Sequence, residues 1–179
     1  MSLIVERGYE KTSVQDILDR ADVGRATFYL HYRSKEDLLR KSLDRLRELL
    51  VKECRSTTTG EMKSRVPLAF SLAFFRHVDS HRKLYRAVVG RESGFIVDRQ
   101  MRRLLVDLVR DEITSSGQAK LKQPWADMVA QYVVGALMSM VTWWLDFNVK
   151  LSPEETDETF RQMTLPAIAS QIPRSVHTR

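Results

Sequence analysis

The stretch ADVGRATFYLHYRSKEDLL, residues 21–39, crowds hydrogen-bond donors onto one short segment. Arg25, Thr27, Tyr29 and His31 follow the link ADVG and fall within about two helical turns of one another. A guanidinium can bond guanine O6 and N7 together, whereas hydroxyl, ring and ammonium donors suit phosphate oxygens. These residue types at this spacing indicate contact with a nucleic acid, provided that the fold presents them on one exposed face.

Two short helices are predicted around the link. Apolar residues at three-and-four spacing predict a helix that ends near Arg20, and they are Val14, Ile17, Leu18 and Ala21. A second helix is expected over 25–32. At 100 degrees per residue, Phe28 and Tyr32 face the preceding apolar stripe, and the opposite face holds Arg25, Ala26, Tyr29 and Leu30. This pairing is typical of a helix-turn-helix.

The rest of the chain also has helical periodicity, which predicts an all-α fold. Further helices are expected over 34–54, 65–79, 81–89, 94–115, 124–148 and 152–170. Capping boxes are expected at Thr12 with Gln15, Ser34 with Asp37, and Ser152 with Glu155. The small polar residues of 55–63 predict a boundary between a DNA-binding domain over 1–55 and a ligand-binding and dimerisation domain over 56–173, followed by a tail over 174–179.

Composition excludes several classes of protein. The net charge is +6, but acidic residues nearly match basic ones within 1–55, so any DNA contact depends on local placement. Cys54 is the only cysteine and cannot form an internal disulfide, which favours a reducing compartment such as the cytoplasm. No apolar run approaches the ~20 residues that span a bilayer, and no signal peptide begins the chain, so no membrane association is expected. We find no motif for catalysis, a metal or a cofactor, and expect none of the three.

Each polar residue of 21–39 has an ordinary alternative explanation. Tyr29 alone could be a surface aromatic, His31 a hydrogen-bonded polar group, and Lys35 a solvated charge. Their joint placement on one helix after a tight link favours the DNA-binding interpretation.

Residues 8–39, GYEKTSVQDILDRADVGRATFYLHYRSKEDLL, resemble the DNA-binding signature of the tetracycline-repressor (TetR) family of bacterial transcription regulators. The recurrent residue types of that motif stand at Gly8, Tyr9, Thr12, Val14, Ile17, Ala21, Val23, Thr27, Tyr29, His31, Ser34, Lys35 and Leu38. The resemblance implies that DNA is contacted by Ser13, Gly24, Arg25, Ala26, Thr27, Tyr29, His31 and Lys35.

The resemblance also implies a longer first helix than the sequence shows. Members of the family have a helix of roughly fifteen residues or more before the GY element, whereas only LIVER lies between MS and Gly8. Most of that helix is absent, so we expect Val14, Ile17 and Phe28 to be exposed and DNA binding by this chain to be weakened.

Beyond residue 56 the chain resembles the family only in plan, with a ligand pocket and a two-helix dimer interface. Candidate pocket residues are Phe70, Phe74, His77, Tyr85, Met101, Arg102, Gln131, Tyr132 and Met138. Apolar residues surround most of the helix over 128–145, so one side must face the domain and another a second chain. The expected dimer interface contains Gly135, Ala136, Ser139, Phe160, Met163 and Ile168.

These expectations describe a ligand-responsive regulator of transcription, a repressor that binds a palindromic operator in double-stranded DNA as a homodimer. Its effector is an unidentified small molecule. The alternative is a helical dimer that binds a ligand or a protein and does not bind DNA.

Overall fold

The computed structural model describes residues 2–56, 68–89, 91–115, 124–147 and 149–171. No strand occurs among these residues, which confirms the all-α prediction. The α-helices are α1 (Ser2–Arg7), α2 (Val14–Ala21), α3 (Arg25–His31), α4 (Lys35–Ser56), α5 (Phe70–Ser80), α6 (Arg82–Val88), α7 (Phe95–Ser115), α8 (Trp125–Asp146) and α9 (Pro153–Gln171), with a 3-10 turn, η1 (Glu92–Gly94), between α6 and α7.

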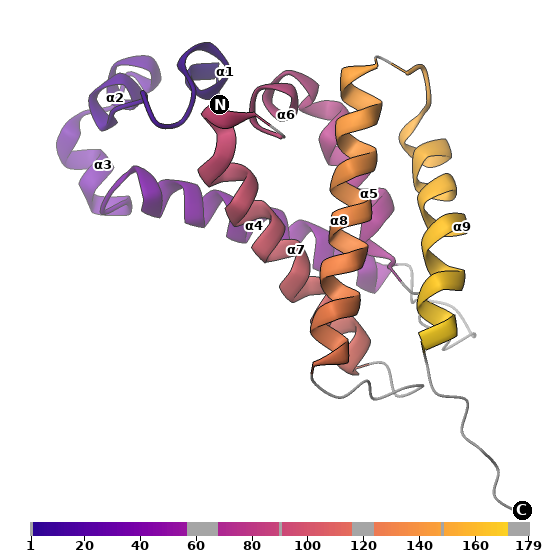
Figure 1. The fold of residues 1–179 in the computed structure, drawn as a ribbon. Helices are drawn as coiled ribbons and strands as arrows, with labels where there is room; N and C mark the ends of the chain where they lie inside the picture. Colours follow the sequence, from indigo (N-terminus) through magenta and orange to yellow (C-terminus); the bar gives the residue numbers. More distant parts are fainter. Residues whose placement is uncertain (1, 57–67, 90, 116–123, 148, 172–179) are drawn as a thin grey trace, which may run out of the picture.

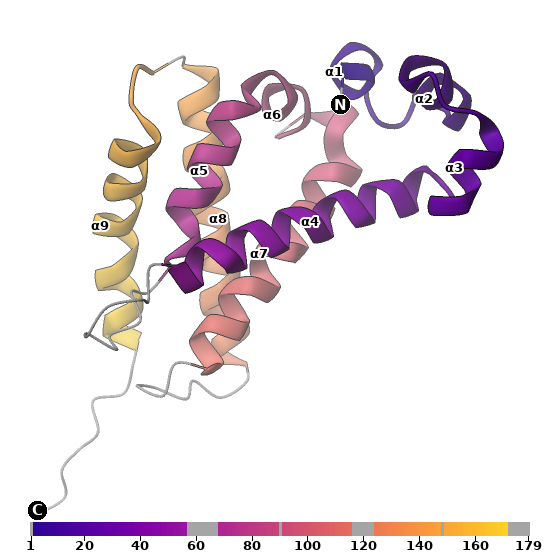
Figure 2. The same ribbon diagram turned by 180° about the vertical axis from the view of Figure 1, so that it is seen from behind.

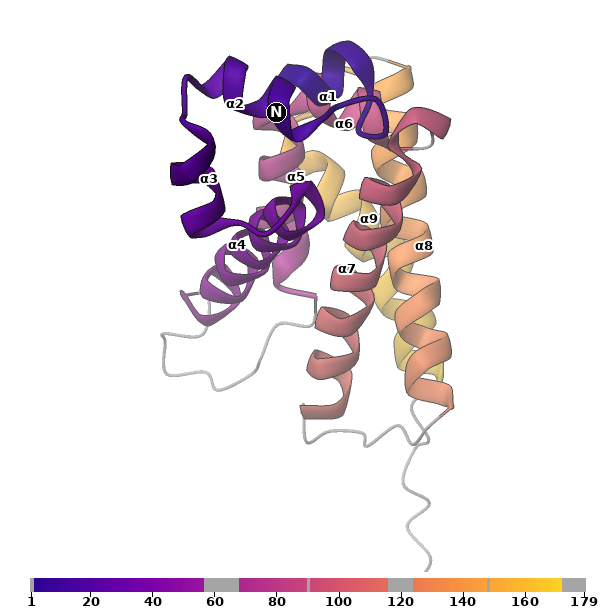
Figure 3. The same ribbon diagram turned by 90° about the vertical axis from the view of Figure 1, so that its left-hand side faces the viewer.

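The small helices α1 to α3 lie at one end of the molecule, and α8 and α9 lie side by side at the other (Figure 1). Between them, α4 extends from the helix-turn-helix to α5 and α7, which is clearest from behind (Figure 2). Seen from the helix-turn-helix end, α2 and α3 lie to one side, on the left, apart from α7 and α8 on the right (Figure 3). The fold thus presents α3 at one end, far from the α8–α9 pair.

Helix α4 belongs to both parts of the chain. Its Leu46 and Leu50 are buried in the main core together with residues of α5, α7 and α8. A boundary at 55/56 therefore assigns α4 to the first domain, although α4 also packs against helices of the second. Residues 57–63 and the tail over 174–179 lie outside the described residues, as does the side chain of Cys54. The division into 1–55 and 56–173 stays a prediction.

Edge-to-face aromatic contacts join α5, α8 and α9 in the main core. The ring of Phe75 meets those of Trp144 and Phe160, each at a centroid distance of 6.0 Å. Helix α8 has the length and composition of a membrane span, but half of its most apolar window is buried inside the protein. It therefore has the character of a core helix of a globular domain.

Of the three predicted capping boxes, one is confirmed, one is wrong and one is confirmed only in part. The capping box of Ser152 and Glu155 is present, because each side chain bonds the other residue's backbone N–H. The box expected at Thr12 is wrong: Ser13 is the N-cap of α2, and Asp16 completes the box. Thr12 is instead buried and donates its hydroxyl to Gly8 O at 2.7 Å. At the start of α4, Asp37 N–H donates to Ser34 Oγ, but the Asp37 carboxylate accepts from Arg33 N–H.

Helix α1 is short, yet it docks the helix-turn-helix onto the rest of the fold. A second apolar cluster contains Tyr9, Val88 and Val97, with Ile4, Leu39, Leu84 and Ile96 packed against it. Because these residues come from the N-terminal part and from the middle of the chain, the cluster joins α1 and α4 to α6 and α7. Phe28 is buried, so the expectation that it would be exposed is wrong, whereas Val14 and Ile17 are half-buried.

Candidate nucleic-acid interface

Helix α3 has one buried anchor and an otherwise exposed surface. Phe28 is 5 % exposed, whereas Tyr29 is 50 % and Leu30 81 % exposed. The rings of Phe28 and Tyr29 meet edge to face at a centroid distance of 5.3 Å. The other residues of the helix, Arg25, Ala26, Thr27 and His31, are exposed as well. The predicted division of α3 into an inner and an outer face is therefore confirmed.

The link between α2 and α3 is a tight turn held by the backbone. Asp22 ends α2 in the left-handed conformation with φ of 52 degrees, and Val23 N–H returns to Leu18 O at 3.1 Å. Gly24 is the N-cap of α3 and has no side chain to occupy its N-terminus. The first backbone N–H groups of α3 are thus left for water or for a phosphate oxygen.

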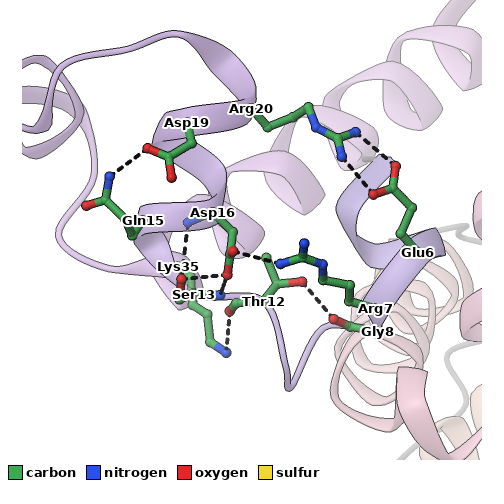
Figure 4. Close-up of polar contacts among 10 residues, drawn as sticks. All are labelled: Glu6, Arg7, Gly8, Thr12, Ser13, Gln15, Asp16, Asp19, Arg20 and Lys35. Carbon is green, nitrogen blue, oxygen red and sulfur yellow. Dashed lines mark hydrogen bonds and ion pairs between the residues drawn. The ribbon is translucent and has the colours of Figure 1, made fainter.

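Two ion pairs join α1 to α2 (Figure 4). Arg20 donates to both carboxylate oxygens of Glu6, at 2.9 and 2.7 Å, and Arg7 donates to Asp16 at 2.9 Å. The hydrogen bond from Arg20 lowers the pKa of Glu6. All four side chains are partly exposed, so these pairs orient the two helices more than they stabilise the fold.

Ser13 begins α2 and is exposed, as a DNA contact requires. Its hydroxyl donates to Asp16 Oδ2 at 2.6 Å and accepts from Asp16 N–H at 3.1 Å (Figure 4). The hydrogen bonds from Ser13 lower the pKa of Asp16. In this structure the hydroxyl hydrogen is therefore used within the capping box.

Lys35, the first residue of α4, is half-buried and faces the turn between α1 and α2. Its ammonium donates to the backbone oxygens of Tyr9, Glu10 and Thr12 at 3.2, 3.2 and 3.1 Å, and it lies 4.7 Å from the centre of the Tyr9 ring. An ammonium has three donors, and here all three have an acceptor. The sequence predicted that Lys35 contacts a DNA phosphate. It did not predict the hydrogen bonds to the α1–α2 turn, because no local pattern places an α4 lysine beside residues 9–12.

Arg25 is held by a chain of hydrogen bonds from α2. Asp19 accepts from Gln15 Nε2 at 2.7 Å, which leaves Gln15 Oε1 to accept from Arg25 Nη2 at 3.1 Å. Asp19 thereby fixes which end of the amide faces the guanidinium. Sequence reasoning identified Arg25 but not Gln15, which was assigned to a capping box instead.

The nine candidate pocket residues do not surround one described cavity. Five of them have almost no accessible surface: Phe70, Phe74, Tyr85, Met101 and Met138. His77 and Arg102 are half-buried, and Gln131 and Tyr132 are exposed. The Tyr85 hydroxyl is buried without a hydrogen-bond partner. A ligand that reaches these core residues would have to displace packed side chains.

Only two candidates, Arg102 and Gln131, line a cavity among those described, an open cleft of about 790 Å³ beside α7. Arg99, Arg103 and Arg110 also line it, together with Glu36 and Asp107. Arg102 and Arg110 already form ion pairs with neighbouring aspartates. Within the described residues, no cluster of three or more metal-ligating side chains occurs.

The candidate dimer residues divide between the surface and the core. Ser139 and Met163 are exposed, Gly135, Ala136 and Ile168 are half-buried, and no atom lies near a Cβ built on Gly135. Phe160 is 1 % exposed and packs against Phe75 of its own subunit, so it cannot contact a second chain without leaving the core. The exposed side of α8 instead carries large apolar residues: Trp125, Met128, Tyr132 and Trp143.

Two family models match the chain. The model described as bacterial regulatory proteins, tetR family, matches residues 1–41, and a model of a transcriptional regulator C-terminal region matches residues 66–165. The chain belongs to the TetR family. It is a DNA-binding transcriptional regulator of the helix-turn-helix type, and α2 and α3 form the motif.

The HTH-type transcriptional activator FasR of Mycolicibacterium smegmatis is 28 % identical to this TetR-family chain over 153 residues, which cover 80 % of this chain and 68 % of that relative. A putative TetR-family regulator from Syntrophomonas wolfei aligns with a TM-score of 0.70 and 18 % identity, over 96 % of this chain and 92 % of the other. The fatty acid degradation regulator FadR from Bacillus halodurans aligns with a TM-score of 0.65 and 20 % identity, over 92 % of both chains. These two structures support the fold alone.

Proposed function

We propose that this protein is a ligand-responsive repressor that binds a palindromic operator as a homodimer. The observation that carries the proposal is the exposed face of α3, where Arg25 and Tyr29 stand beside open backbone N–H groups at the helix start. A helix of this kind fits the major groove of DNA with its N-terminal residues at the base edges. Arg25 reads a guanine, and Thr27, Tyr29 and His31 contact phosphates.

The homodimer supplies the second α3 that a palindrome requires. The exposed apolar residues of α8 suit a twofold interface, in which the same surface of each subunit meets its copy. In this dimer the twofold axis relates the α8 and α9 helices of the two subunits, and operator binding requires that it set the two α3 helices in successive major grooves, roughly 34 to 36 Å apart.

Repression follows from occupation of promoter DNA, and the effector releases the dimer from it. The relative FasR is named a transcriptional activator, so the direction of regulation is tested directly. In a transcription reaction with purified polymerase and a promoter that contains the operator, the protein should reduce transcript. An increase would assign activation instead.

The decisive experiment selects operators from random duplex DNA and then titrates binding at several salt concentrations. A protein that neutralises phosphates loses affinity steeply with salt, whereas a dimer that binds only an apolar ligand or a protein selects no sequence. A selection without a common palindrome would overturn the proposal in favour of that alternative.

Arg25→Ala tests the groove placement on the selected operator. Loss of a bidentate guanine contact costs about 1–3 kcal/mol and relaxes the preference at one base pair of each half-site. Arg45→Ala is the matched control, because Arg45 is an exposed arginine of α4. If both variants bind all sequences as the unmodified protein does, α3 does not enter the groove as proposed.

A further inference from the structure

Leu30 is the most exposed large apolar side chain among the described residues, at 81 %. It lies one helical turn after Ala26, so the two form an apolar pair on the outer face of α3. Phe28 already anchors this helix, and the fold makes little use of Leu30. Burial of the Leu30 side chain would therefore stabilise a complex with a binding partner and not the folded subunit itself.

The neighbours of Leu30 indicate which partner covers it. Arg25 and Tyr29 form the adjacent pair of the same outer face, so whatever Arg25 contacts also approaches Leu30. A leucine has no donor for a phosphate or for a base acceptor. The apolar group that a base pair presents in the major groove is the thymine C5-methyl, which aliphatic side chains contact.

We infer that Leu30, flanked by Ala26, determines specificity by contacting a thymine methyl group in each operator half-site. The inference rests on the proposed entry of α3 into the major groove. It adds an apolar contact to the guanine contact of Arg25. The expected half-site therefore holds a thymine within a few base pairs of the guanine, on the side toward which α3 runs.

The test removes only the methyl group. In the operator selected with the unmodified protein, each thymine of the half-site is replaced in turn by deoxyuridine, which pairs identically. One replacement should weaken binding by about fourfold, the value of one buried methyl group. Leu30→Ala should bind the thymine and deoxyuridine operators equally, which completes a double-mutant cycle. Alanine favours the helix, and the exposed site leaves no cavity.

Leu49→Ala is the matched control, because Leu49 is a 43 % exposed leucine of α4. This variant should keep the fourfold discrimination. If the unmodified protein ignores every deoxyuridine, or if Leu30→Ala still discriminates, the inference is overturned while operator binding stands. If no operator can be selected at all, the inference and the proposed function both fail.

Discussion

Among single residues, Lys35 shows how a side chain suited to DNA can have a structural task. Three backbone oxygens of the α1–α2 turn converge on its ammonium. Gly8 opens this turn with φ of 79 degrees, a conformation that favours glycine. Without a cation at this point, the carbonyls of residues 9, 10 and 12 would lose a shared partner at the start of α2. Lys35 thus positions α2, and through it α3.

Lys35→Met should therefore destabilise the protein without removing a phosphate contact. We expect a loss of about 2 kcal/mol in the free energy of unfolding in urea, since hydrogen bonds to a charged group are worth more than neutral ones. The salt dependence of operator binding, measured well below the unfolding transition, should keep its slope. Lys52→Met, at an exposed position of α4, serves as control. Unchanged stability with a slope reduced by about one would make Lys35 a phosphate contact instead.

At the scale of elements, two junctions define how the helices meet. Between α6 and α7, a Cβ on Gly94 would lie 2.3 Å from Val88 Cα, so only glycine allows η1 to pack this close to α6. Between α5 and α6, the rings of His77 and His81 lie 4.4 Å apart, and Tyr85 meets His77 edge to face. At the α5–α6 junction, the titratable ring of His77 is thus half-buried against the ring of Tyr85.

The α5–α6 junction should make stability depend on pH. Burial, and then the neighbouring His81, lowers the pKa of His77 from 6.5 to about 4. Between these values the unfolded chain binds a proton that the folded chain does not. The contribution of His77 to the free energy of unfolding is therefore complete above pH 6.5 and is lost as the pH falls toward 4.

Urea unfolding of His77→Phe at pH 4, 5, 6 and 7.5 checks this expectation. Phenylalanine keeps a ring against Tyr85 but cannot be protonated, so the variant should lose less stability than the unmodified protein as the pH falls. His31→Gln, at an exposed position of α3, should follow the unmodified protein. Identical pH profiles for His77→Phe and the unmodified protein would show that His77 titrates alike in both states.

At the scale of the whole molecule, α8 has more apolar surface than one subunit can bury. Its inner side contributes Val133, Leu137, Val141 and Trp144 to the core, whereas Tyr132 and Trp143 stay exposed. Exposed apolar residues that recur along one helix mark an interaction surface. The dimer that we propose covers this surface.

Gly135→Arg and Tyr132→Glu should each yield monomers and abolish operator binding, although α3 is untouched. A twofold interface contains each substitution twice, so two charges would be buried. Neither change disturbs the subunit core, because Tyr132 is exposed and the space beside Gly135 is open. Sedimentation at micromolar concentration measures the outcome. A 20.8 kDa species for the unmodified protein would contradict the dimer.

The sequence by itself determined the local features of this protein. Helix periods follow from neighbours three and four residues apart, so the all-α fold, the faces of α3 and the cap at Ser152 could be predicted. The signature over residues 8–39 was enough to identify the family, since its residue types lie close together in the chain. The misplaced cap at Thr12 was a choice between two adjacent patterns, and Asp16, three residues after Ser13, was the missed signal.

Only the tertiary structure decided which side chains meet across distant segments. Lys35 contacts carbonyls more than twenty residues earlier, and Phe160 contacts Phe75, so neither partner follows from a periodic pattern. An apolar residue of α9 could equally face a second chain or its own core, and packing against α5 resolved this for Phe160. Burial and long-range hydrogen bonds depend on the relative placement of whole helices, which local periodicity does not contain.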